Sequence, residues 1–181
     1  MKECDVSDSG VVREKCPVCQ FEWDVISPEE VSPRIRRAVG EFVDVLQQNR
    51  DISSLRPDTE RWSIIEYAAH VRDVLLLVRD RLVLTVVEDR PTPSPLYRDE
   101  RVRLNLYGSE TVDSVSSDLE IAAKLFTTVF DVLCPENANR TLMYGYPKPA
   151  ERSFAWTGAQ VLHECEHHLD DVRQNATQLT K

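Results

Sequence analysis

The run Val161-Leu162-His163-Glu164-Cys165-Glu166-His167-His168-Leu169 lies in a segment whose apolar residues recur at the spacing of an amphipathic helix. His163 and His167 are four residues apart, so a helix places them on one face, one turn above the other. The one histidine outside this run, His70, lies in another segment with helical periodicity. We therefore expect a fold that brings two histidine-bearing helices together.

Four segments of the chain show helical periodicity. Two of them begin with N-cap patterns, Ser32 before Pro33 and Ser63 three residues before Glu66. No segment is a convincing strand. Residues 91–109 form a long connection between two helices, and connections of this length more often have a function than serve only as linkers. The expected helices run from Ser32-Pro33 to residues 47–50, from Ser63 to about Val87, from Thr111 or Ser114 to Cys134-Pro135, and from Ser153 or Thr157 to about Thr177.

An all-α four-helix bundle with long crossover loops is therefore the expected fold of residues 31–181. A chain of 181 residues is long enough to bury one ordinary core, and 41% hydrophobic with 29% charged residues is typical of a soluble globular protein. Residues 1–30 differ from the rest and form a small cysteine-bearing segment ahead of the bundle.

The N-terminal segment contains Cys4 and the C-x-x-C pair Cys16 and Cys19. Two thiolates on one tight turn are the ligand spacing of a small zinc site, with Cys4 as a third ligand. No histidine is near these cysteines in the sequence. The fourth ligand would therefore be an acidic residue, a water molecule, Cys134 or Cys165. Ordinary reduced thiols are the alternative. A redox motif fits less well, because the pair does not follow a strand and open a helix.

Charge and composition exclude several classes of protein. A net charge of -9 argues against nucleic-acid binding, which needs basic surface to neutralise phosphates. The longest apolar stretch, 74–87, is interrupted by charged residues at 79–81, so we expect no membrane span. The polar start does not resemble a signal peptide, and five cysteines without one indicate a cytoplasmic protein.

His70, His163 and His167 are the candidate ligands of a metal inside the bundle, because helix bundles build such sites from side chains on facing helices. Three neutral imidazoles leave a divalent cation its full charge and an open position, as in catalytic sites. The alternative is that these histidines are ordinary surface or core residues. His168 is rotated by about 100° from His167 on a helix. We assign it to the residues that orient ligands, together with Asp73, Glu166 and Asp171.

Residues 61–73, Arg-Trp-Ser-Ile-Ile-Glu-Tyr-Ala-Ala-His-Val-Arg-Asp, resemble the W-S-x-x-E-x-x-x-H-x-x-D signature of the DinB-like superfamily. Residues 161–171 resemble the H-x-x-x-H-H helix of that family. The resemblance covers about residues 33–176. Further segments are similar to an actinobacterial branch of the family: residues 87–91, 97–102 and 146–153, and the Cys-Pro-x-Cys-x-Phe opening.

The resemblance implies a DinB-type four-helix bundle in which His70, His163 and His167 hold a divalent metal. Zinc is the first expectation, and nickel or manganese are alternatives. Relatives with assigned activity are thiol-dependent transferases and isomerases that use bacillithiol, mycothiol or glutathione, including mycothiol-dependent maleylpyruvate isomerase. The best-characterised transferases lack the cysteine-bearing N-terminus. The resemblance is also the ground for expecting a homodimer.

For this chain the resemblance implies a metal-dependent enzyme, a mycothiol-type S-transferase or isomerase that activates a thiolate. Its partners would be a low-molecular-weight thiol and an electrophilic small molecule. Two alternatives share the same residues: a hydrolase that uses hydroxide on the metal, and a non-enzymatic metal-binding or protein-interaction module. The candidate cationic anchors for such a thiol are Arg61, Arg72, Arg98, Arg101, Arg103 and Arg152. The candidate residues lining the mouth of the pocket are Tyr67, Tyr97, Tyr144 and Tyr146.

Overall fold

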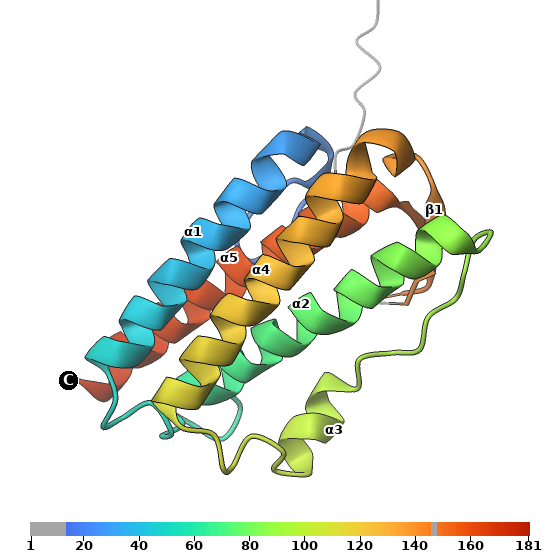
Figure 1. The fold of residues 1–181 in the computed structure, drawn as a ribbon. Helices are drawn as coiled ribbons and strands as arrows, with labels where there is room; N and C mark the ends of the chain where they lie inside the picture. The colour runs from blue at the N-terminus through green and yellow to red at the C-terminus, as the bar shows by residue number, and fades with distance from the viewer. Residues whose placement is uncertain (1–13, 146–147) are drawn as a thin grey trace, which may run out of the picture.

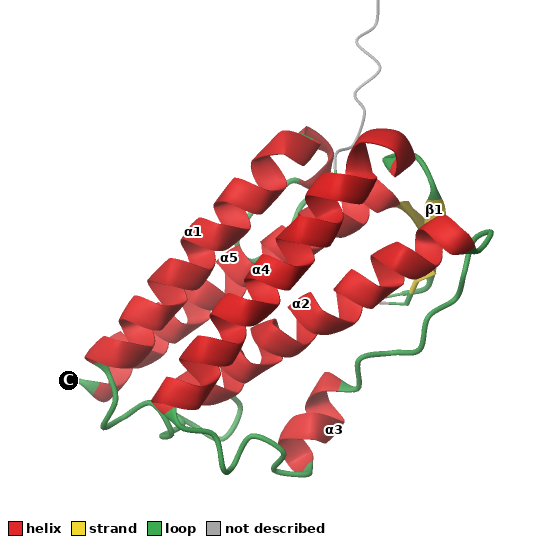
Figure 2. Cartoon of the chain, in the orientation of Figure 1, coloured by secondary structure: helices red, strands yellow, loops and turns green. Residues whose placement is uncertain are grey.

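Four long helices form the body of the protein in a computed structural model that describes residues 14–145 and 148–181 (Figures 1 and 2). They confirm the predicted bundle. The helices are α1 (Pro28–Gln48), α2 (Ile64–Val87), α4 (Val112–Asn137) and α5 (Phe154–Leu179), with the short α3 (Arg98–Arg103) in the crossover between α2 and α4. No helix in the described ranges is both long and apolar enough to cross a membrane.

The order of the helices around the bundle differs from their order in the chain. Helices α1 and α2 each pack against both α4 and α5, and have few contacts with each other, so they lie on a diagonal. Figure 1 shows that α1 and α5 run in the same direction, as do α2 and α4. Parallel neighbours cannot be joined by a tight turn. The connection from α2 to α4 therefore runs back along the bundle, and α3 lies within it.

Capping side chains define the starts of three helices: Ser63 as predicted, and Thr111 and Ser153, each of which was one of two predicted alternatives. The hydroxyl of Ser63 accepts a hydrogen bond from the N–H of Glu66 at 3.2 Å, and the Glu66 carboxylate accepts from the N–H of Ser63 at 2.8 Å. Thr111 caps α4 by accepting from the N–H of Ser114. Ser153 caps α5. These residues satisfy backbone donors that have no partner inside a helix.

The predicted start of the first helix at Ser32-Pro33 was wrong by more than one turn. Ser27 is the N-cap and Pro28 the first helical residue, with the Glu30 carboxylate accepting a hydrogen bond from the N–H of Ser27. The same Ser-Pro pattern therefore occurs twice, and only the first copy is followed by an acidic residue at the third helical position. Pro33 lies inside α1.

The end of α4, the third long helix, also differs from the predicted end at Cys134-Pro135. The helix continues through Pro135 and ends at Asn137. A two-stranded antiparallel hairpin follows, with β1 (Thr141–Tyr144) paired to β2 (Ala150–Ser153), although no strand was expected from the sequence. The N–H of Met143 also bonds to the carbonyl of Pro91 at the start of the crossover. The hairpin therefore connects the crossover to the beginning of α5.

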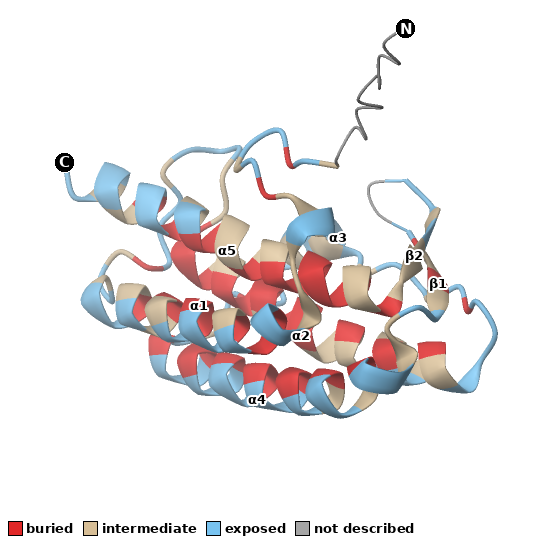
Figure 3. Ribbon diagram, turned by 90° about the horizontal axis from the view of Figure 1, so that it is seen from above, coloured by how far each residue is buried: buried red, intermediate tan, exposed pale blue. Residues whose placement is uncertain are grey.

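The core lies along the facing sides of the four helices, where the buried residues gather (Figure 3). Phe130 on α4 stacks on Phe126 and Phe154, with ring centroids 6.0 and 5.8 Å apart. Gly158 on α5 permits this packing, because a Cβ there would lie 2.1 Å from a ring carbon of Phe130. The close approach of α4 and α5 at this point therefore depends on a glycine.

Asp73 fixes the crossover to α2. Its carboxylate accepts hydrogen bonds from Arg101 at 2.6 Å, from the hydroxyl of Tyr107 at 2.9 Å and from Arg72 at 3.1 Å. Arg101 and Tyr107 come from the crossover, and Tyr107 is buried. One buried carboxylate on α2 thus holds the segment that covers the side of the bundle.

Candidate metal centre

Helix α5 carries two pairs of potential ligands on adjacent faces. His163 and His167 form one pair at a spacing of four residues, and Glu164 and His168 form the other. The second pair is rotated from the first by about 100° around the helix axis. Three groups of described residues are close enough to share one ion. They are His163 and His167 with the N-terminal cysteines, His70 with Glu164 and His168, and a third group of His167, His168 and Asp171. The structure therefore divides the three histidines predicted as one set.

The bundle site consists of His70 on α2 with Glu164 and His168 on α5. One carboxylate oxygen of Glu164 lies 3.4 Å from Nε2 of His70 and 3.3 Å from Nε2 of His168. Ligand bonds of about 2.0–2.2 Å around a tetrahedral cation separate neighbouring ligand atoms by roughly 3.3–3.6 Å. The carboxylate oxygen thus lies from each imidazole nitrogen at the spacing of two ligands of one tetrahedral cation, and all three atoms lie within 4.8 Å of one another.

Neighbouring side chains orient the ligands of the bundle site. The other oxygen of Glu164 accepts a hydrogen bond from the Gln160 amide at 2.7 Å, and Gln160 in turn accepts one from the indole of Trp23 at 2.8 Å. Asp171 lies 2.8 Å from Nδ1 of His168 and leaves Nε2 of that ring directed at Glu164. Such partners fix the ring orientation of metal ligands.

The electrostatics of the bundle site keep Glu164 ionised. Burial opposes its ionisation, but hydrogen bonds to His168 and His70 hold the pKa of the carboxyl well below its usual value. Burial lowers the pKa of His70, which favours the neutral imidazole that binds metals. Burial has the same effect on His168, but hydrogen bonds to Asp171 and Glu164 outweigh it and raise the pKa to about 9. The buried carboxylate of Glu164 thus stabilises positive charge on His168, whereas burial favours the neutral form of His70.

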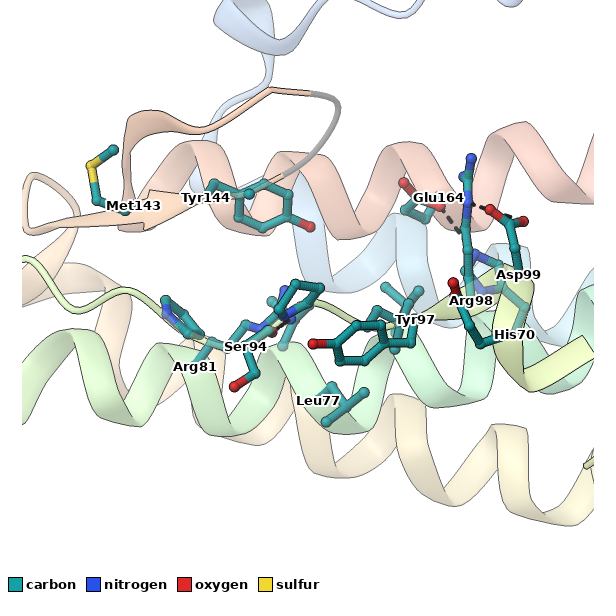
Figure 4. Close-up of a pocket in the computed structure, with 17 residues that line it drawn as sticks. His70, Leu77, Arg81, Ser94, Tyr97, Arg98, Asp99, Met143, Tyr144 and Glu164 are labelled. Carbon is teal, nitrogen blue, oxygen red and sulfur yellow. Dashed lines mark hydrogen bonds and ion pairs between the residues drawn. The ribbon is translucent and has the colours of Figure 1, made fainter. Parts of the chain in front are cut away.

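A pocket of about 250 Å³ opens beside the bundle site, and His70 and Glu164 form part of its wall. Figure 4 shows both residues at one end of the pocket, with Tyr144 near the other end. Arg81 on α2 and Arg98 on α3 are cationic lining residues. The long connection at residues 91–109 therefore forms one wall of the pocket. The remaining lining residues come mainly from α2, the crossover and β1: Val74, Leu77, Val78, residues 93–97, Asp99, Glu100, Met143 and Gly145.

The second group joins the N-terminal segment to α5. Cys16, Cys19, His163 and His167 each offer a ligand atom, and these four atoms lie within 4.8 Å of one another. Sequence reasoning left the fourth ligand of the cysteine site open, because no histidine is close to it along the chain. Cys4, the predicted third ligand, lies outside the described residues.

The other predicted orienting residues have different partners. Glu166 forms a bidentate ion pair with Arg34 on α1, at 3.0 and 2.7 Å, and Asp73 anchors the crossover. Asp171 contacts His168, and His168, which was predicted to orient ligands, is itself a candidate ligand. Sequence reasoning missed Glu164, although its spacing of four residues from His168 was the available signal.

Comparisons with known proteins agree with this architecture. A profile of the DinB superfamily matches residues 33–172. No match was found among curated proteins. A solved structure from Bacillus subtilis, YfiT, described as "a probable metal-dependent hydrolase with an unusual four-helix bundle topology", superposes with a TM-score of 0.75 at 14% sequence identity. The match covers 86% of this chain and 90% of that one. With its family profile matched over most of its length, this chain belongs to the DinB superfamily.

Proposed function

We propose that the protein is a metal-dependent enzyme that acts on a small molecule in the pocket beside the bundle site. The observation that carries this proposal is the position of His70 and Glu164, which are both members of the ligand group and lining residues of the pocket. A purely structural metal is closed on all sides by protein ligands, whereas a catalytic site keeps one position open to substrate. Three protein ligands beside a pocket fit the second description.

The donor set fits a divalent cation, with zinc as the first expectation and nickel or manganese as alternatives. A cation bound there would lower the pKa of water or of a thiol beside it, so that a nucleophile exists near neutral pH. Glu164 supplies the negative charge of the site, and Gln160 and Asp171 hold Glu164 and His168 in place. Arg81 and Arg98 offer positive charge to an anionic substrate group in the pocket.

Hydrolysis is the reaction that this ligand set favours. Two histidines and a glutamate hold the zinc of hydrolytic enzymes such as thermolysin and carboxypeptidase A. The description of YfiT as a probable metal-dependent hydrolase supports the same reaction class for this chain. We therefore rank a hydrolase above the thiol-dependent transferase or isomerase that the family resemblance implies.

Thiol transfer is the second candidate, and a separate observation favours it. Two arginines, Arg81 and Arg98, line a pocket whose other walls are largely apolar. A low-molecular-weight thiol of the mycothiol, bacillithiol or glutathione type needs polar and cationic anchors of this kind, with its sulfur directed at the ligand group. An electrophilic co-substrate would then occupy the rest of the pocket.

Metal content and turnover of matched variants test the proposal. Glu164→Gln keeps the size of the side chain but removes its charge, and should lose metal from the bundle site together with activity. Glu166→Gln is the matched control, because that carboxylate lies on the same helix and pairs with Arg34 instead. Activity should be screened on ester and amide substrates, and on electrophiles with and without added thiol. Turnover that requires thiol would identify the transferase, and turnover without it the hydrolase.

Two results would contradict the proposal. The first is an unchanged metal content and activity in Glu164→Gln and His70→Asn. The second is metal binding at the bundle site without turnover of any substrate class, which is the result that a non-enzymatic metal-binding module predicts.

A further inference from the structure

We propose that Cys16, Cys19, His163 and His167 bind a structural zinc ion, separate from the bundle site, that joins the N-terminal segment to α5. All four ligand atoms lie within 4.8 Å of one another. The sequence spacing is also that of Cys₂His₂ zinc sites, with two residues between the cysteines and three between the histidines. We refer to these four residues as the knuckle site.

The backbone of the N-terminal segment presents both cysteines from one tight turn. The N–H of Gln20 bonds to the carbonyl of Cys16 at 2.9 Å, and the N–H of Cys16 bonds to the carbonyl of Phe21 at 2.8 Å. Gln20, directly after the second cysteine, has a left-handed backbone with φ of 61°. Such a conformation is uncommon for a residue other than glycine and persists where the surrounding structure requires it. The turn places the two thiols on the side that faces α5.

The histidines provide independent support for a bound cation. Both ring nitrogens of His163 are buried and have no hydrogen-bond partner among the described residues. Its ring packs against Phe21 and Trp23, with centroids 5.2 and 4.8 Å apart. Buried polar atoms without partners are rare, because burying them unpaired costs free energy. A cation between the imidazole and the two thiols would provide a partner for one of the two ring nitrogens of His163.

The ligand atoms of the knuckle site lie within about 1 Å of the spacing that tetrahedral zinc requires. Sγ of Cys16 lies 3.9 Å from Nδ1 of His167, and the rings of His163 and His167 have centroids 5.1 Å apart. With bonds of about 2.3 Å to sulfur and 2.0–2.1 Å to nitrogen, tetrahedral neighbours are separated by roughly 3.3–3.8 Å. Four protein ligands fill every position of a tetrahedron. This arrangement is typical of a structural metal rather than a catalytic one.

The knuckle site would also stabilise the geometry of the bundle site. His167 belongs to the knuckle site, and its Nε2 lies 3.8 Å from the same Asp171 oxygen that contacts Nδ1 of His168 at 2.8 Å. On the other side, the indole of Trp23 in the N-terminal segment donates to Gln160, which donates to Glu164. The structural zinc would thus fix the segment and the helix face that orient two ligands of the bundle site.

Cobalt substitution distinguishes the two sites, because only the knuckle site contains thiolates. Untagged protein should be depleted of metal, titrated with Co²⁺ and examined by absorption spectroscopy, with zinc content measured in parallel by elemental analysis. We expect one equivalent per chain to show thiolate-to-cobalt charge transfer and the intense visible bands of tetrahedral cobalt. Cys19→Ser and His167→Asn should each lose that signal and one equivalent of zinc per chain. Cys134→Ser, which alters a buried cysteine outside the site, should retain both.

Two further variants and two refuting results make the test decisive. Cys19→His keeps a metal ligand at a half-exposed position, so recovery of zinc binding would show that Cys19→Ser lost a ligand rather than its fold. His70→Asn should keep the thiolate signal, because it alters only the bundle site. A thiolate signal in Cys19→Ser equal to that of the original protein would overturn the proposal. The same holds if the original protein binds no cobalt through sulfur while its thiols are reduced.

Discussion

Replacing Asp73 by Asn should weaken both the protein and the attachment of its crossover. Asp73 accepts hydrogen bonds from Arg101 and from Tyr107, and its side chain is only 9% exposed. A hydrogen bond to a buried charged group contributes about 1.5–3 kcal/mol. The Arg101 side chain is 33% exposed, so solvent screening reduces its pair to about 1 kcal/mol. Asn keeps one oxygen acceptor, and we therefore expect a loss of about 2–3 kcal/mol.

Urea unfolding, followed by circular dichroism, measures this loss. For a slope near 2 kcal/mol/M, the midpoint should fall by about 1–1.5 M. Tyr107→Phe removes a single donor and should cost about 1–1.5 kcal/mol. Because Asp73 and Tyr107 are in direct contact, the double variant should cost less than the sum of the single ones. Limited proteolysis within residues 91–109 should also accelerate in both variants.

The reasoning fails if Asp73→Asn changes the free energy of unfolding by less than about 0.5 kcal/mol, the range of ordinary surface substitutions. It also fails if proteolysis in the crossover is unchanged while global stability falls. That result would show that the carboxylate stabilises α2 without holding the segment that lines the pocket.

Three other perturbations give separate expectations. Burial opposes the ionisation of Glu66, but hydrogen bonds to Arg56 and to the N-cap Ser63 outweigh burial and lower the pKa of the carboxyl. The stabilisation from ionised Glu66 should therefore be present above about pH 4.5 and lost at lower pH. In urea unfolding, Glu66→Gln should lower the free energy of unfolding by about 1 kcal/mol at neutral pH and by little at pH 3. Gly158→Ala should destabilise by about 2 kcal/mol through overlap with Phe130, whereas Gly40→Ala, a helical position with open space, should be neutral or stabilising. Removing bound metals with a chelator should lower the melting temperature measured by calorimetry, and re-addition of zinc should restore it.

Local signals in the sequence were sufficient for much of the fold. The Ser63 to Glu66 pattern located the start of α2, because both partners of that cap lie within four residues. Helical periodicity correctly gave four long helices. The hairpin after α4 was missed because each strand has four residues and its stability depends on contacts with the crossover. The start of α1 was misplaced because one Ser-Pro pair is followed closely by another.

Most candidate metal ligands were recognised in the sequence, but Glu164 was missed, His168 was assigned an orienting role, and the division of the candidates into sets was not predicted. His163 with His167 and Glu164 with His168 have the same spacing, and spacing alone does not state which helix face meets which neighbour. That choice depends on the rotation of α5 between α2 and the N-terminal segment, which is a property of the packed bundle. Cys16 and His167 are 151 residues apart in sequence and meet only in the folded protein.

The diagonal placement of α1 and α2 has a consequence for how the protein is made. During synthesis α1 emerges early, yet one of its two principal neighbours is α5, which follows every other helix. The apolar face of α1, which includes Ile35, Phe42 and Leu46, lacks this packing partner until the residues between α1 and α5, and α5 itself, have been translated. Contacts between such distant segments slow folding and leave apolar surface exposed to chaperones. Both proposed metal sites also need ligands from α5, so neither can be completed before this helix has been translated.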